Sequence, residues 1–192
     1  MITKNDIIQK IRDDLYLTGK QKIMDSLPEN QNALFVGKLR IPTKMHIEII
    51  KEALKSYNHI VICIVKASKD VKESLSLIRQ EQILYALFGD KISIISHSSG
   101  NLLSIINKSP KRIKYLLCGS DRVDSYKQQL LKLPNIRIIE THRDLLNDIS
   151  ATKTIDAIKN NDEVTFKKMT DTTLWNMFSI IKGELNEVER SK

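Results

Sequence analysis

Cysteine, aromatic residues and long apolar runs are all scarce in this sequence. The 2 cysteines, Cys63 and Cys118, each lie in an apolar stretch, so we expect small buried side chains in a reducing compartment rather than a disulfide or a zinc site. With 5 tyrosines, 4 phenylalanines and 1 tryptophan, the chain has too few aromatic rings for a base-stacking surface, which argues against a nucleic-acid partner. The longest apolar run, Ile60 to Val65, is far too short to span a membrane.

The overall charge of the chain suits anionic partners. Lys and Arg number 31 against 23 Asp and Glu, so the net charge is +8 and the pI is about 9.4. Nucleotides, nucleic acid and anionic surfaces all fit this excess, and so does an ordinary soluble surface. The N-terminus is charged throughout and lacks the apolar core of a signal peptide. We therefore expect a cytoplasmic protein.

Short apolar runs alternate with amphipathic segments along most of the chain. The pattern predicts strands at 33–36, 59–65, 92–95, 113–118 and 136–139, and helices at 45–56, 75–88, 101–107 and 120–131. The run at 59–65 is continuous and β-branched, which is typical of a strand buried on both faces. This alternation predicts an α/β fold: a Rossmann-like, doubly wound, parallel five-stranded sheet with helices on both faces.

Helical patterns flank this region at both ends. Residues 1–30 carry apolar residues at helical spacing, and the pattern is helical again from Ser150 to the end. We therefore divide the chain into a helical N-terminal extension (1–30), an α/β domain (31–160) and a C-terminal helical segment (161–192). The apolar stripe of the extension must be buried. We expect it to pack across the domain or against another chain in a protein assembly, away from the ligand site.

A basic loop joins the first predicted strand to the helix that follows it. Residues 37–46 read Gly-Lys-Leu-Arg-Ile-Pro-Thr-Lys-Met-His, and their cations are Lys38, Arg40 and Lys44. In doubly wound sheets the ligand binds beyond the carboxyl ends of the strands. These cations and the first-turn N–H groups of the helix therefore predict an anion cradle. Thr43 is a natural N-cap, and His46 lies one turn further along the same helix face.

Two later junctions also carry polar residues at the start of a helix. Residues 119–122 read Gly-Ser-Asp-Arg after the fourth strand, and residues 149–153 read Ile-Ser-Ala-Thr-Lys. Each segment has two interpretations, an anion site or a plain helix cap, with Ser120 or Asp121 as the cap in the first segment and Ser150 in the second. Arg122 either contacts a substrate or lies in solvent.

Together these segments resemble the HxGH/TxGH nucleotidyltransferases of the cytidylyltransferase-like superfamily. The resemblance is to the nicotinamide-mononucleotide adenylyltransferases and their phage-type branch, which often read Gly-Arg-Phe-Gln-Pro-Pro-Thr-x-Gly-His. This chain keeps Gly37, Pro42, Thr43 and His46 of that motif. The Gly-Ser-Asp-Arg segment, the Ile-Ser-x-Thr segment and residues 160–169 are similar to later segments of the branch, in the same order. The resemblance covers roughly residues 32–170. If a phage encodes the chain, as the resemblance implies, the expected location is the host cytoplasm or the virion.

The resemblance implies an activity and a set of site residues. The activity is transfer of a nucleoside monophosphate from ATP or CTP to a small phosphorylated acceptor such as nicotinamide mononucleotide, with release of pyrophosphate; Mg²⁺ accompanies the triphosphate. The catalytic residues it implies are His46, Thr43 and Lys38. The nucleotide-binding residues it implies are Gly37, Arg40, Lys44, Met45, Gly119, Asp121, Arg122, Ser150, Thr152 and Lys153. It implies no metal ligand among the side chains.

Two positions depart from the family pattern. Met45 stands where the motif has glycine, and its side chain occupies the place where a nucleotide approaches the helix. Ile155 stands where the Ile-Ser-x-Thr segment of the family has a later arginine, so Arg40, Lys66 or Lys69 would have to supply that charge. Two functions remain open: an active nucleotidyltransferase, or the same fold kept as a binding or structural subunit of a viral particle or other assembly. If the site has been lost, Met45→Gly with Ile155→Arg is expected to restore it.

Overall fold

Five parallel strands form a single sheet in the order β3-β2-β1-β4-β5. The computed structural model describes residues 31–66, 74–131, 133, 135–141 and 149–190. Its strands are β1 (Asn32–Gly37), β2 (His59–Val65), β3 (Ile92–His97), β4 (Tyr115–Gly119) and β5 (Arg137–Thr141). The chain moves outward from β1 to β3, then returns to the other side of β1, so the strand order reverses between β1 and β4. The predicted α/β, doubly wound fold class is confirmed.

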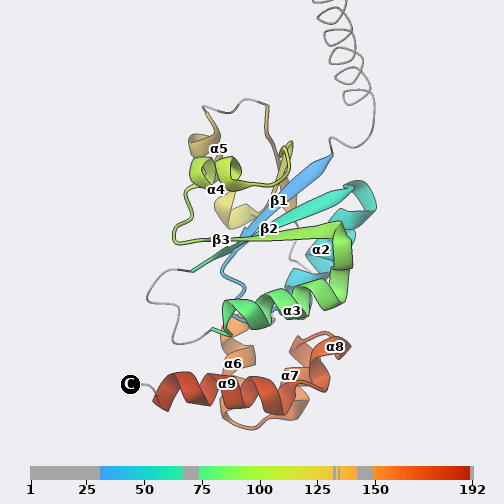
Figure 1. The fold of residues 1–192 in the computed structure, drawn as a ribbon, viewed down its shortest axis with the longest axis vertical. Helices are drawn as coiled ribbons and strands as arrows, with labels where there is room; N and C mark the ends of the chain where they lie inside the picture. The colour runs from blue at the N-terminus through green and yellow to red at the C-terminus, as the bar shows by residue number, and fades with distance from the viewer. Residues whose placement is uncertain (1–30, 67–73, 132, 134, 142–148, 191–192) are drawn as a thin grey trace, which may run out of the picture.

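Helices cover both faces of this sheet (Figure 1). On one face lie α2 (Lys44–Ser56) and α3 (Leu77–Phe88); on the other lie α4 (Leu102–Lys108) and α5 (Val123–Leu130). Strand β2 shows why the sequence forms this arrangement, because all five residues from Ile60 to Ile64 are fully buried. Ile60, Ile62 and Ile64 join the core on the α2 and α3 side, and Val61 and Cys63 join the core on the α4 and α5 side.

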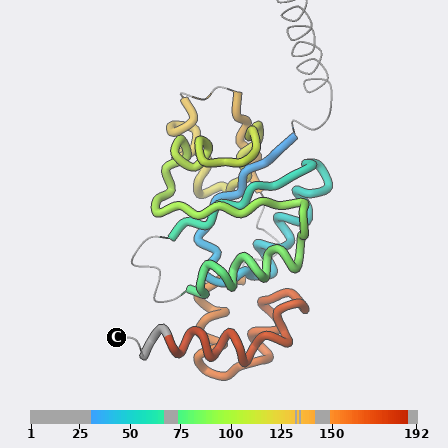
Figure 2. The backbone as a smooth tube through the Cα atoms, viewed as in Figure 1, coloured from blue at the N-terminus to red at the C-terminus, as the bar shows by residue number. Residues whose placement is uncertain are grey.

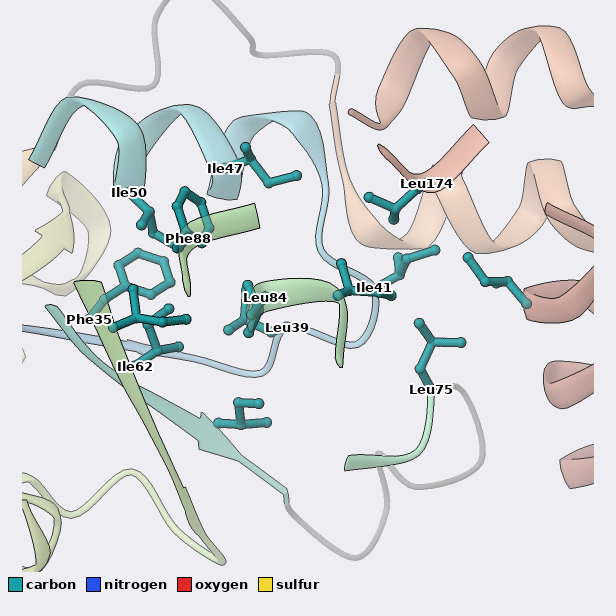
Figure 3. Packing of buried hydrophobic residues seen from close by; sticks show 14 of the residues in the cluster. Phe35, Leu39, Ile41, Ile47, Ile50, Ile62, Leu75, Leu84, Phe88 and Leu174 are labelled. Atoms are coloured by element: carbon teal, nitrogen blue, oxygen red, sulfur yellow. The ribbon is translucent and has the colours of Figure 1, made fainter. Parts of the chain in front are cut away.

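Four further helices extend the core on the α2 and α3 side. They are α6 (Ala151–Lys159), α7 (Glu163–Met169), α8 (Thr172–Trp175) and α9 (Phe178–Arg190), and they form one end of the molecule (Figure 2). The rings of Phe166 and Phe178 meet edge to face with centroids 5.0 Å apart. Leu174 of α8 lies in the same cluster as Ile41 and Leu75 (Figure 3). The helical pattern expected from Ser150 onward corresponds to these four helices, which are separated by short turns such as the one at Asn161, where φ is 59°.

Several predictions from the sequence can be judged directly on the described residues. Cys63 and Cys118 are both buried, and burial raises the pKa of Cys63 to about 11, so its thiol stays protonated near neutral pH. The expected cap of α5 is wrong: Ser120 and Asp121 lie in a short 3₁₀ turn (Ser120–Arg122), and α5 begins after it without a side-chain cap.

The helical N-terminal extension, its role in assembly and Lys69 lie outside the described residues. No helix in the described ranges combines the length and apolar character needed to cross a membrane.

Candidate functional site

A cleft of about 460 Å³ opens at the carboxyl edge of the sheet, where the strand order reverses. This is the position at which doubly wound sheets bind ligands, and the volume falls in the range of small-molecule sites. Its wall contains eight of the residues implicated by the sequence: Gly37, Lys38, Arg40, Met45, His46, Gly119, Asp121 and Arg122. The wall does not include the other implicated residues, although each is within two positions of a residue that does line the cleft: Thr43, Lys44, Ser150, Thr152 and Lys153.

In the loop between β1 and α2, cationic side chains alternate with buried apolar side chains. Lys38 is exposed and Arg40 is half-buried, whereas Leu39 and Ile41 are 2% and 0% exposed. Leu39 packs near Leu84, and Ile41 lies toward Leu174 (Figure 3). The two apolar side chains therefore fix the loop to the core while the two cations lie beside the cleft.

This loop is strained, and hydrogen bonds from α3 and from the residues just before it hold the loop in place. Leu39 has a φ of 44°, a left-handed conformation that costs a non-glycine residue about 1–2 kcal/mol. The buried Gln80 amide donates to the Leu39 carbonyl at 2.7 Å, and the Leu75 N–H donates to the Arg40 carbonyl at 2.9 Å. Burial of Leu39 and these hydrogen bonds offset the strain and hold the position from which the Arg40 side chain departs.

Thr43 and His46 form a hydrogen-bonded unit at the N-terminus of α2. The Thr43 N–H donates to His46 Nδ1 at 3.2 Å, and the Thr43 hydroxyl lies 2.8 Å from the same nitrogen. A backbone N–H can only donate, so Nδ1 acts as the acceptor and the ring carries its proton on Nε2. Phe35 contacts the ring edge to face, with centroids 6.3 Å apart. The predicted shared face of Thr43 and His46 is confirmed, and the contacts fix both the tautomer and the ring orientation.

Arg40 connects the first junction to the start of α6. Its Nη2 donates to the Thr152 hydroxyl at 2.6 Å, although the two residues are 112 positions apart in the sequence. Lys66, the other described residue that we considered as a source of charge, donates instead to the Leu75 carbonyl at 3.1 Å. The guanidinium of Arg40 is therefore the cation that reaches the N-terminus of α6.

The start of α6 is capped as the sequence predicts. The Ser150 side chain accepts a hydrogen bond from the Lys153 N–H at 3.1 Å, so the capping interpretation of this segment holds. Lys153 and Thr152 are exposed, and Ala151 reaches the wall of the cleft. The first-turn N–H groups of a helix carry partial positive charge, and here they lie next to Arg40.

Ile155 does not face the cleft, contrary to what the motif spacing suggested. It is 3% exposed and packs in the core with Ile158 and Phe166. The expectation that Ile155→Arg would restore phosphate binding is therefore wrong, because that position points into apolar packing. Met45, in contrast, does line the cleft and is partly exposed, as its place in the motif predicted.

The opposite wall adds residues that sequence patterns did not single out. Tyr126 of α5 lines the cleft at 7% exposure, and burial raises the pKa of its phenol, with Arg122 partly opposing that effect. The phenol therefore stays protonated and can donate a hydrogen bond.

Asp121 and Arg122 pair with each other at 3.4 Å and are both exposed. Gly100 also contributes to the wall; it follows β3, whose carboxyl end lies at this edge of the sheet.

The described residues do not build a metal centre of their own. They contain no group of three or more histidine, cysteine, aspartate or glutamate side chains arranged to hold an ion. Asp121 is the one carboxylate among the described residues that line the cleft. Mg²⁺ is commonly held by one or two carboxylates together with substrate phosphates, so a magnesium ion at this cleft would belong chiefly to a bound triphosphate.

Solved structures of adenylyltransferases share the fold of this chain. The nicotinic acid mononucleotide adenylyltransferase of Plasmodium falciparum, complexed with APC, superposes with a TM-score of 0.57 at 16% identity over 81% of this chain and 96% of that chain. The same enzyme complexed with NaAD gives a TM-score of 0.56 at 14% identity, over 81% and 97% of the two chains. A bifunctional NMN adenylyltransferase/ADP ribose pyrophosphatase from Francisella tularensis gives 0.55 at 12% identity, over 84% of this chain and 54% of that chain.

These likenesses establish a nucleotidyltransferase-like fold. The chain spans about half the length of the bifunctional protein and nearly the full length of the Plasmodium enzyme. No protein-family model matches the sequence, and no curated protein matches it.

Proposed function

We propose that this protein is a nucleotidyltransferase that transfers a nucleoside monophosphate from ATP or CTP to a small phosphorylated acceptor. The observation that carries the proposal is the convergence of two helix N-termini on one cleft. The neutral His46 ring stands at the first, and Arg40 reaches across to the second. The structural neighbours act on nicotinic acid mononucleotide or NMN by name, so a pyridine mononucleotide is the acceptor that we propose to test first.

The reaction requires alignment and charge rather than a covalent nucleophile. A phosphate oxygen of the acceptor attacks the α-phosphorus of the triphosphate, and the bond from that phosphorus to the bridging oxygen breaks as pyrophosphate leaves. The protein must hold the two reactants in line and stabilise negative charge on the phosphates. Lys38, Arg40 and the N–H groups of α2 and α6 surround the cleft with donors of the required sign.

In this proposal His46 donates from Nε2 to an oxygen of the α-phosphate. Because the Thr43 amide keeps Nδ1 as an acceptor, the donor needs no change of tautomer during the reaction, and the Thr43 hydroxyl supports the same orientation. Arg40 and the N-terminus of α6 hold the distal phosphates. The Ser150 hydroxyl accepts from the helix itself, so at this junction we assign phosphate contact to Arg40, Thr152 and the N–H groups.

Magnesium enters the proposal as part of the substrate. It neutralises charge on the triphosphate oxygens when bound, and Asp121 is the side chain positioned to approach it. We assign no step of the transfer to the metal. The role of this chain is to position the triphosphate against the acceptor and to exclude unproductive geometries.

Pyrophosphate release tests the proposal. The four nucleoside triphosphates are combined with magnesium and with NMN or nicotinic acid mononucleotide, and pyrophosphate is measured for the wild type, His46→Ala and His59→Ala. His59 lies at the opposite edge of the sheet, bonded to Ser93, and serves as the matched control. We expect release with at least one pair, about a hundredfold loss of kcat in His46→Ala, and wild-type activity in His59→Ala.

Two results would overturn the proposed transfer. One is nucleotide-induced thermal stabilisation without pyrophosphate release from any pair, which would identify a non-catalytic binding protein. The other is equal loss in His46→Ala and His59→Ala, which would remove His46 from the proposed chemistry.

A further inference from the structure

The amino edge of the sheet, opposite the cleft, carries a group of cations that the proposed reaction does not use. We call this group the basic edge; its members are Lys108, Lys111, Arg112, Lys114 and Arg137. They lie at the C-terminus of α4, in the turn before β4 and at the first residue of β5. Strand β4 separates them from the cleft, and its five residues span roughly 16 Å. Within the described ranges, none of these five side chains forms an ion pair with an acid.

The basic edge is concave. One hollow of about 460 Å³ includes Lys111 and Arg112 in its wall, and an adjoining hollow of about 380 Å³ includes Arg112, Lys114 and Arg137. The two hollows share Arg112, Ile113 and Asn135. Four of the five cations therefore line two adjoining hollows rather than a convex surface, and Lys108 lies outside both walls.

The backbone beneath these cations is held in place. The Asn32 side chain, 7% exposed, donates to the Arg112 carbonyl at 3.1 Å. The Lys114 N–H donates to the Asn32 carbonyl at 3.1 Å, and the Arg137 N–H donates to the Lys114 carbonyl at 2.8 Å. Three cationic residues thus start from backbone that is fixed to β1 and to each other, which reduces the ordering cost of binding a charged partner.

We propose that the basic edge binds the phosphate backbone of a nucleic-acid duplex. Backbone binding requires cations matched to successive phosphates and releases condensed counterions. It does not require base stacking, so the scarcity of aromatic rings argues only against a surface for unpaired bases. Lysine is depleted at protein–protein interfaces, whereas nucleic-acid interfaces are polar and strongly positive. A duplex backbone can also enter a concave surface that a flat lipid bilayer cannot follow.

Neutralising three cations of the basic edge tests this assignment. The variant Arg112→Gln, Lys114→Gln and Arg137→Gln is compared with a control, Lys127→Gln, Lys167→Gln and Lys168→Gln, which removes the same charge from exposed positions on α5 and α7. Binding of a fluorescent random-sequence duplex is followed by anisotropy between about 50 and 200 mM salt. Melting curves of both variants establish that they are folded.

Each phosphate contact contributes about 0.9 to the slope of log affinity against log salt. We expect the basic-edge variant to lower this slope by about 2.7 and to weaken duplex binding at least tenfold, while the control stays close to the wild type. Thermal stabilisation by ATP is expected to be the same in all three proteins, so the outcome is independent of the proposed transfer reaction.

His59 provides a second readout from inside the folded protein. Its pKa is lowered chiefly by burial and also by Lys111, against a small opposing effect of Asp90. Phosphates seated at Lys111 would weaken the effect of that cation, so we expect NMR titration to show a higher His59 pKa with the duplex bound.

Three results would overturn the assignment. They are absence of duplex binding at the lowest salt, an equal loss of binding in the control variant, and binding of phosphatidylserine vesicles or polyglutamate in place of the duplex.

Discussion

The substitution Ile155→Arg is expected to destabilise the protein strongly and to leave nucleotide binding unimproved. Ile155 is 3% exposed in the core that joins α6 to α7 and α9. Burial of an isoleucine side chain contributes about 1.5–3 kcal/mol, and a guanidinium buried without a partner costs several kcal/mol more. The sum is a large share of the roughly 5–15 kcal/mol that keeps a domain folded.

Two control substitutions isolate burial as the cause. Ile155→Val removes one methylene and is expected to cost about 0.5–1.5 kcal/mol. Asp156→Arg introduces the same guanidinium at the exposed neighbouring position and is expected to change stability by less than about 0.5 kcal/mol.

Thermal melts with and without ATP measure these effects. For a chain of this size, 1 kcal/mol corresponds to about 2–4 °C in Tm, so we expect Ile155→Arg to lower Tm by more than about 10 °C or to prevent folding. Ile155→Val remains measurable if the arginine variant cannot be purified. A Tm for Ile155→Arg within a few degrees of the wild type, together with tighter ATP binding, would refute the inward orientation of this residue.

Three further outcomes follow from particular contacts. Arg40→Met removes the cation that reaches Thr152. Since a charged hydrogen bond contributes about 1.5–3 kcal/mol, the ATP affinity measured by calorimetry should fall at least tenfold. An unchanged affinity would contradict the assignment of Arg40 to the phosphates. Met45→Gly opens the cleft wall, so nucleotide affinity should rise. Tm should fall by about 2–4 °C, because glycine has a helix propensity roughly 1 kcal/mol less favourable. Weaker nucleotide binding in this variant would show that the methionine belongs to a working pocket. Glu184 is partly buried, which raises its pKa, but hydrogen bonds from Ser76 and Arg79 outweigh this and hold the pKa below 4.5. The stabilising contribution of Glu184 is therefore present above pH 4.5 and is lost as the pH falls through its lower pKa in the folded protein. Glu184→Gln should make Tm less dependent on pH on the acid side. An unaltered dependence of Tm on pH would show that the carboxylate adds nothing to stability.

The elements that the sequence predicted best are those whose signal is local. Strand β2 was predicted with its observed bounds because six successive apolar, mostly β-branched residues follow His59 and end before Lys66. The start of α5 was missed because Ser120 and Asp121 are good caps by residue type, whereas the chain makes a 3₁₀ turn before the helix begins. Residue type alone does not distinguish these two local geometries.

The site was predictable as a set of segments but not as a set of contacts. The loop at 37–46 and the helix start at 150–153 were identified from their residues, yet the Arg40–Thr152 bond joins positions 112 apart and depends on how α6 docks. Ile155 was misplaced for the same reason. Motif spacing gives a position along α6, whereas the face that the residue presents is set by packing with Phe166 and the helices around it.

The anchoring of the β1–α2 loop has a consequence for the far end of the molecule. Ile41, next to Arg40, shares its packing with Leu174 of α8 (Figure 3). The helix α8 spans only four residues, so its length allows few hydrogen bonds within the helix itself. A ligand gripped by Arg40 would restrain Ile41 and, through it, the local opening of α8. Amide hydrogen exchange in α8 would then slow when a ligand fills the cleft. The exchange rate of a helix that does not line the cleft would therefore report whether the cleft is occupied.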